Sequence, residues 1–88
     1  MERIEIELLA PGGNGAVVRM PGRRYPGVVI QGDSLSIMRR QVAELTAACA
    51  QGDVDGALDL SQFLLADLDE NLGSYEDALA RHGIPRPY

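Results

Sequence analysis

The 88-residue sequence predicts an α+β fold, a three-stranded antiparallel β-meander followed by a two-helix hairpin packed on one face of the sheet. Three observations predict this order. Aliphatic side chains alternate with period two at the start of the chain, and they recur at spacings of three and four after residue 33. Glycine- and proline-containing turns separate the early segments. The length suits one domain, residues 1–88, without repeats or linkers.

The first part of the chain predicts three short strands. A strand is predicted over residues 3–9, because charged and aliphatic side chains alternate from Arg3 to Leu8, which is typical of a strand with one solvated face. A turn over residues 11–15 leads to a second strand at residues 16–20, and another turn leads to a third at residues 28–31. The aliphatic side of the first strand consists of Ile4, Ile6 and Leu8.

The first helix is predicted to begin at Asp33 or Ser34, because either side chain can accept a hydrogen bond from a free backbone N–H of the first turn. Gly52 is expected to end it in the left-handed conformation. One apolar stripe runs along this helix, and we expect the Cys49 thiol to be buried within it. The stripe consists of Leu35, Met38, Val42, Leu45 and Cys49.

The second helix is predicted to begin at Asp53 or Asp55 and to end near His82. Gly83 and Pro85 stop it, and Ile84 is expected to fold back on its last turn. Its leucines form an arc that we expect to face the core. The arc consists of Leu58, Leu60, Leu64, Leu65, Leu68, Leu72 and Leu79.

Composition excludes several functions. The formal net charge is −5, and residues 45–88 carry eight acids against two arginines, which disfavours a nucleic-acid binder. One cysteine and one histidine cannot build a multi-thiolate or two-histidine metal site, so no metal or cofactor is expected. The apolar runs are too short to span a membrane, and the cysteine usage suits the cytoplasm.

Gly32-Asp33-Ser34-Leu35 matches the signature of the serine esterases named after those four letters. Nucleophilic catalysis by Ser34 needs a histidine base and a third group that orients it. The esterases carry Asp-x-x-His, but Leu79 stands three residues before His82. We therefore interpret the segment as a helix cap, His82 as a capping or surface residue, and the protein as no enzyme.

Phe63 lies outside the leucine arc of the second helix, with Asp59 and Asp67 one turn away on either side and Glu70 two turns along. An aromatic ring among carboxylates on a solvated face is typical of a binding site for a basic protein. Asp59, Phe63, Asp67 and Glu70 are therefore the predicted partner-binding residues. The alternative is that a slight rotation of the helix, or a second subunit, covers the ring.

Residues 25–35 read Tyr-Pro-Gly-Val-Val-Ile-Gln-Gly-Asp-Ser-Leu and resemble the strand-to-helix segment of the HicB-type antitoxins. With the preceding hairpin, the resemblance covers residues 3–50. It implies a small α+β protein with a degenerate RNase H-like fold that binds and blocks a small basic ribonuclease. As a whole, the chain resembles a small uncharacterised actinobacterial family without an assigned activity.

These patterns favour a non-enzymatic, cytoplasmic protein-binding module, similar to an antitoxin or immunity protein, whose acidic helix face binds a basic toxin or nuclease. The alternative is a self-associating structural or scaffold protein. Val17 and Val29 are predicted on the outer face of the sheet. Because exposed valines and sheet edges favour association, we expect a homodimer.

Overall fold

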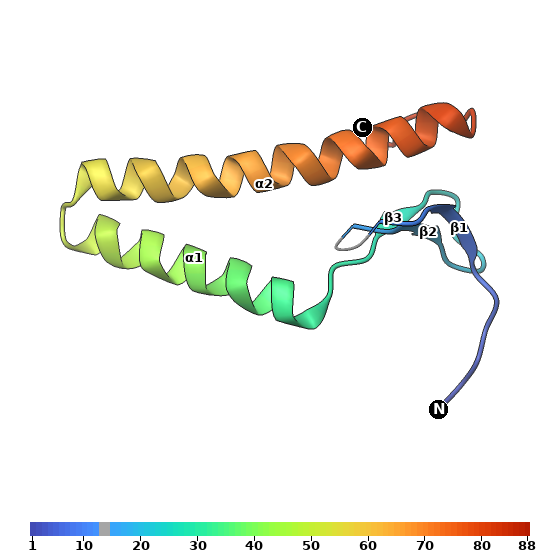
Figure 1. The fold of residues 1–88 in the computed structure, drawn as a ribbon, viewed down its shortest axis with the longest axis horizontal. Helices are drawn as coiled ribbons and strands as arrows, with labels where there is room; N and C mark the ends of the chain where they lie inside the picture. The colour runs from blue at the N-terminus through green and yellow to red at the C-terminus, as the bar shows by residue number, and fades with distance from the viewer. Residues whose placement is uncertain (13–14) are drawn as a thin grey trace. The chain divides into compact units, whose positions relative to one another are not determined.

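The computed structural model describes residues 1–12 and 15–88, and it confirms the predicted β-β-β-α-α order (Figure 1). Gly13 and Asn14 of the first predicted turn lie outside the described residues. The three strands form an antiparallel sheet in the order β1-β2-β3. The elements are β1 (Glu7–Ala10), β2 (Val17–Arg19), β3 (Gly27–Val28), α1 (Gly32–Ala50) and α2 (Val54–Arg81).

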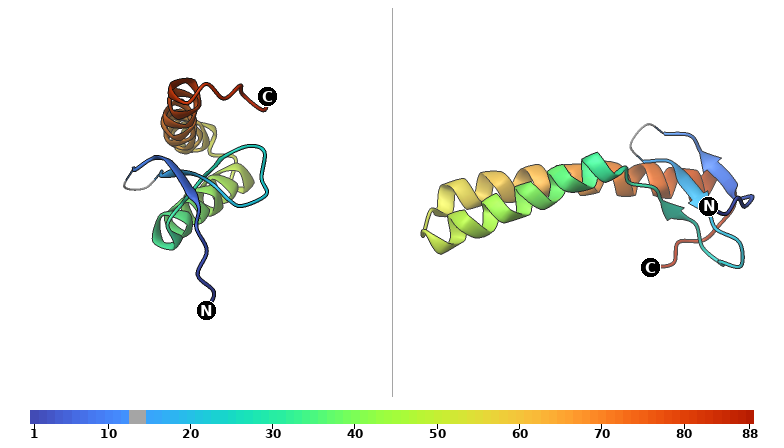
Figure 2. Two further views of the ribbon diagram at one scale, coloured as in Figure 1. Left: turned by 90° about the vertical axis from the view of Figure 1, so that its right-hand side faces the viewer. Right: turned by 90° about the horizontal axis from the view of Figure 1, so that it is seen from below.

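The chain divides into two compact units. One consists of Met1–Ile30 together with Asn71–Tyr88, and therefore holds the sheet and the C-terminal part of α2. The other, Gln31–Glu70, holds α1 and the N-terminal part of α2, which run antiparallel and side by side in the views of Figures 1 and 2.

The core of the first unit lies between the sheet and the last turns of α2. Val17 and Ala78 are fully buried and Leu79 is 1% exposed. The Tyr75 hydroxyl, also buried, donates a hydrogen bond of 2.9 Å to the carbonyl oxygen of Pro26, just before β3. A smaller shell of partly buried side chains surrounds this core, consisting of Leu9, Ala10, Val28 and Ile84.

The strands are shorter than predicted, and β1 presents the opposite face to the core. Leu8 is 58% exposed, whereas Leu9 packs on the buried cluster. The register of β1 against β2 shifts between Leu8 and Ala10, and a bulge of this kind re-aims the side chains of a strand. The prediction for the inward side of the first strand was therefore wrong.

Val17 was also placed on the wrong face. It is fully buried against α2, whereas Val29 is 44% exposed. Because β2 is the central strand, its Val17 supplies the contact with α2, and the sheet lacks the outer pair of valines on which the expected dimer rested.

Helix α1 begins two or three residues earlier than a cap at Asp33 or Ser34 requires. Its N-cap is Gln31, which makes no side-chain cap hydrogen bond, so Ser34 lies inside the first turn. Asp33 accepts a hydrogen bond of 2.8 Å from the backbone N–H of Ser34. The prediction that Asp33 or Ser34 caps the helix was wrong, because Gly32 already adopts the helical conformation.

The other helix ends follow the sequence closely. Asp53 caps α2, with its Oδ1 accepting a hydrogen bond of 3.0 Å from the Gly56 N–H. Gly52 (φ 71°) and Gly83 (φ 65°) adopt the left-handed conformation just after α1 and α2. The residue after each glycine donates a backbone hydrogen bond to a carbonyl oxygen of the last helical turn, as in a Schellman motif. Asp53 donates to Ala48, and Ile84 donates to Leu79.

The leucine arc of α2 is only partly buried, which corrects the expectation that it forms the core. Leu58, Leu65 and Leu68 are each more than half exposed, and Leu72 is 44% exposed. A helix of 28 residues is about 42 Å long. The longest strand has four residues and spans only about 13 Å. The sheet is therefore too short to cover the helix.

We predict that Tyr75→Phe lowers the free energy of unfolding by about 1–2 kcal/mol, because it leaves the Pro26 carbonyl unpaired. Burial raises the pKa of Tyr75 above its usual value of 10. The neutral phenol is thus favoured in the folded state, and its contribution is complete below pH 10 and lost as the pH rises through the folded pKa. Denaturant unfolding across this alkaline range should show a steeper loss for the natural protein than for the variant. Equal slopes would contradict this role.

Gly73→Ala is predicted to raise the free energy of unfolding by about 1 kcal/mol, because glycine is a poor helix former and an added Cβ at this position meets open space. Gly56→Ala is the matched control in the same helix. There the Cβ would collide with the carboxylate of Asp53 and disturb the cap. In thermal unfolding, Gly73→Ala should raise the midpoint temperature and Gly56→Ala should lower it. A lower midpoint temperature for Gly73→Ala would refute the argument.

Candidate functional site

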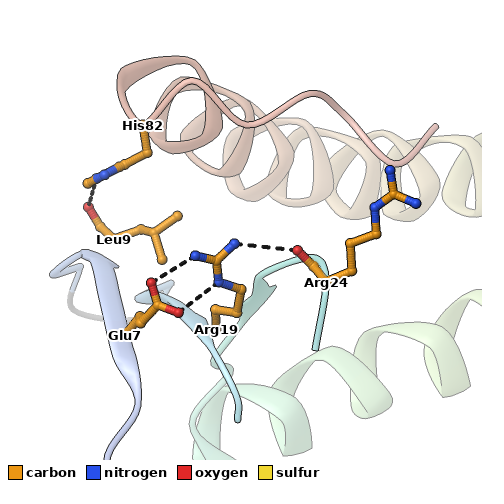
Figure 3. Close-up of polar contacts among 5 residues, drawn as sticks. All are labelled: Glu7, Leu9, Arg19, Arg24 and His82. Carbon is orange, nitrogen blue, oxygen red and sulfur yellow. Dashed lines mark hydrogen bonds and ion pairs between the residues drawn. The ribbon is translucent and has the colours of Figure 1, made fainter. Parts of the chain in front are cut away.

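The polar side chains near the sheet form structural contacts (Figure 3). Arg19 of β2 donates two hydrogen bonds to Glu7 of β1, of 3.0 and 2.8 Å, and a longer one of 3.4 Å to the carbonyl oxygen of Arg24. The hydrogen bonds lower the pKa of Glu7 and raise the pKa of Arg19. Because the guanidinium of Arg19 already pairs with Glu7, it does not provide a site for another anion.

His82 links the end of α2 to the first strand (Figure 3). Its Nε2 lies 3.0 Å from the carbonyl oxygen of Leu9. A carbonyl oxygen only accepts hydrogen bonds, so Nε2 carries the proton and donates it. This nitrogen therefore has a structural role. Within the described residues, no cluster of three or more His, Cys, Asp or Glu side chains could hold a metal ion.

The predicted partner-binding residues lie on exposed turns of α2. Phe63 is 69% exposed, and Asp59, Asp67 and Glu70 are exposed as well. Because residues three, four and seven positions apart share a helix face, these four residues form one surface, here called the acidic face. One alternative was that a slight rotation of the helix buries the ring within the chain. The exposure of Phe63 shows that this alternative was wrong. Whether the acidic face binds a partner stays a prediction.

A second surface was missed by the sequence reasoning. It consists of apolar side chains on the side of the hairpin opposite the acidic face and is here called the leucine face. Cys49 belongs to it and is exposed, so the expectation of a buried thiol was wrong. The strands predicted from the sequence are already much shorter than the predicted helices, which indicates that part of the helix surface is left uncovered by the sheet but not what covers it. The leucine face comprises Leu35, Val42 and Cys49 of α1 and Leu58, Leu65 and Leu68 of α2.

An open groove of about 490 Å³ lies in this face where α1 and α2 meet. Leu45 and Cys49 line it from α1, and Ala57, Leu58 and Ser61 line it from α2. This shared lining shows that the exposed stripes of the two helices belong to one surface. The groove is apolar and holds no cluster of catalytic groups, so its chemistry suits a hydrophobic side chain of another protein.

Neither helix, within the described residues, combines the length and the hydrophobicity that crossing a bilayer requires.

Comparison with known proteins identifies a family but no activity. The model of a family of unknown function, DUF6959, matches residues 1–88. No curated protein and no solved structure matches the chain.

The exposure of Phe63 predicts how stability responds to its removal. Phe63→Ala is expected to change the free energy of unfolding by no more than about 0.5 kcal/mol, as at other surface positions. Leu79→Ala, in the core, should lower it by about 2–5 kcal/mol. Urea unfolding of the two variants makes the comparison. Losses of similar size would mean that Phe63 belongs to a core and that the acidic face is not a displayed surface.

Proposed function

We propose that this chain, which belongs to the DUF6959 family of unknown function, is a non-enzymatic protein-binding module whose acidic face binds a basic protein. One observation carries the proposal, namely that Phe63 is 69% exposed on the same helix face as three carboxylates. Exposing a large ring to water is unfavourable, and a partner that covers it recovers this free energy.

The ring and the acids have different tasks in such a complex. A buried aromatic side chain near the centre of an interface supplies much of the affinity. The carboxylates of Asp59, Asp67 and Glu70 attract a positively charged protein and orient it during encounter. The whole of α2 reinforces this attraction, since it carries seven acidic residues and one arginine.

A small basic toxin or nuclease is the partner class that suits this surface, and the chain would block it in the manner of a cytoplasmic antitoxin or immunity protein. The charge of the acidic face supports this reading. The resemblance of residues 25–35 to HicB-type antitoxins supports it independently, because those residues lie outside the acidic face.

Photo-crosslinking in the source organism tests the proposal directly. The chain is produced with p-benzoylphenylalanine in place of Phe63, which keeps an aromatic ring at the centre of the acidic face. The matched control carries the same residue in place of Gln62, one position away on a different side of α2. Mass spectrometry should identify a basic protein crosslinked from position 63 and not from position 62. Adducts that are absent, or equal at both positions, would refute the proposal.

Binding kinetics with the captured protein then test the roles of ring and charge. Phe63→Ala should weaken the complex by roughly 2 kcal/mol. Asp59→Asn with Glu70→Gln should mainly slow association and reduce its salt dependence. A control of equal net charge, Glu2→Gln with Glu5→Gln, neutralises two exposed acids that precede β1, outside the acidic face, and should have a smaller effect. An affinity that is insensitive to Phe63→Ala would contradict the proposal.

A further inference from the structure

The unit Gln31–Glu70 lacks a core of its own. All of its residues are described, and Ala48 is the only one that is buried. A two-helix hairpin with so little buried apolar surface cannot offset the entropy of ordering its backbone. We infer that a second copy of this chain covers the leucine face, so that two hairpins form a four-helix bundle.

The leucine face has the pattern of a helix-bundle interface. With successive residues 100° apart, the half-buried positions of each helix define the direction toward the other helix. On each helix, the surface that extends about 120° from this inward direction, on the side of the leucine face, contains no charged residue. Leu58 and Leu65 lie one heptad apart, and Leu68 follows three residues later, which is the spacing of bundle core positions.

Charge indicates that the occupant is another copy. Arg39 of α1 and Asp69 of α2 lie at the two outer edges of the leucine face, each about 140° from its helix's inward direction. Both are exposed, and neither forms an ion pair among the described residues. A second copy offers the opposite charge at each edge, whereas a uniformly basic or acidic partner would repel one of them.

The positions of these charges also select the symmetry. A two-fold axis parallel to the helices places α1 of one copy on α2 of the other, with the two inter-helix turns at the same end. Arg39 then lies within about one helical turn of Asp69 of the partner subunit. A perpendicular two-fold axis would instead place α1 on α1, and the outer edge of α1 offers no carboxylate.

This assembly is independent of the proposed function. The acidic face lies on the other side of the hairpin from the leucine face, so a dimer leaves Phe63 free. Binding to a basic partner and self-association can each fail without the other.

Sedimentation equilibrium of the full chain gives the first test. The mass should be twice the 9.5 kDa of one chain at high concentration and fall toward it on dilution. Leu65→Asn should shift the equilibrium to monomer, whereas Phe63→Ala, which changes the opposite face, should leave it unchanged. A monomer mass at all concentrations, with amide hydrogens of α1 and α2 protected from exchange, would overturn the inference.

Charge reversal gives a second test that does not depend on leucines needed for folding. Arg39→Glu and Asp69→Arg, each alone, should weaken the dimer about tenfold or more by placing like charges opposite each other. The chain that carries both changes should regain the natural affinity for itself, because opposite charges again face each other at each edge of the interface. Loss in both single variants without recovery in the double variant would overturn the parallel two-fold arrangement.

Discussion

The contact between the last turns of α2 and the central strand is the constraint on which the first unit depends. Val17, Ala78 and Leu79 exclude water there, and the buried Tyr75 hydroxyl fixes the helix to the chain before β3. The His82 imidazole adds a second polar connection, to β1. With strands of two to four residues, the backbone pairing of the sheet alone would be marginal. The helix therefore stabilises the sheet as much as the sheet orients the helix.

A short sheet and a long helix have a direct consequence for the surface of the hairpin. The sheet can cover only a part of α2, and the rest of the helix pairs with α1, leaving two chemically different exposed surfaces on the hairpin. The leucine face is apolar and contains the groove, whereas the acidic face carries an aromatic ring among carboxylates. The two proposals rest on these surfaces, self-association on the apolar one and binding of a basic partner on the acidic one.

The acidic face could be predicted from the sequence because it depends only on helical periodicity. Once α2 is a helix, Phe63 and Asp67 must share a side, whatever else the chain does. The leucine face could not be predicted in the same way. Its residues fit a helix stripe equally well whether the sheet, another helix or a second copy covers them. Only the burial of each side chain distinguishes these cases, and burial is a property of the whole assembly of elements.

The sequence by itself determined the order of the elements and three of the four helix ends, because these depend on local chemistry. Gly52 and Gly83 supply left-handed backbone, and Asp53 supplies a carboxylate within reach of a free N–H. Tertiary structure decided which residues are buried. The bulge in β1 turned Leu9 inward in place of its neighbour, and the brevity of the strands left Leu65 in solvent. Both outcomes arise because side-chain burial is set by the register and length of packed neighbours, which lie far away in the sequence.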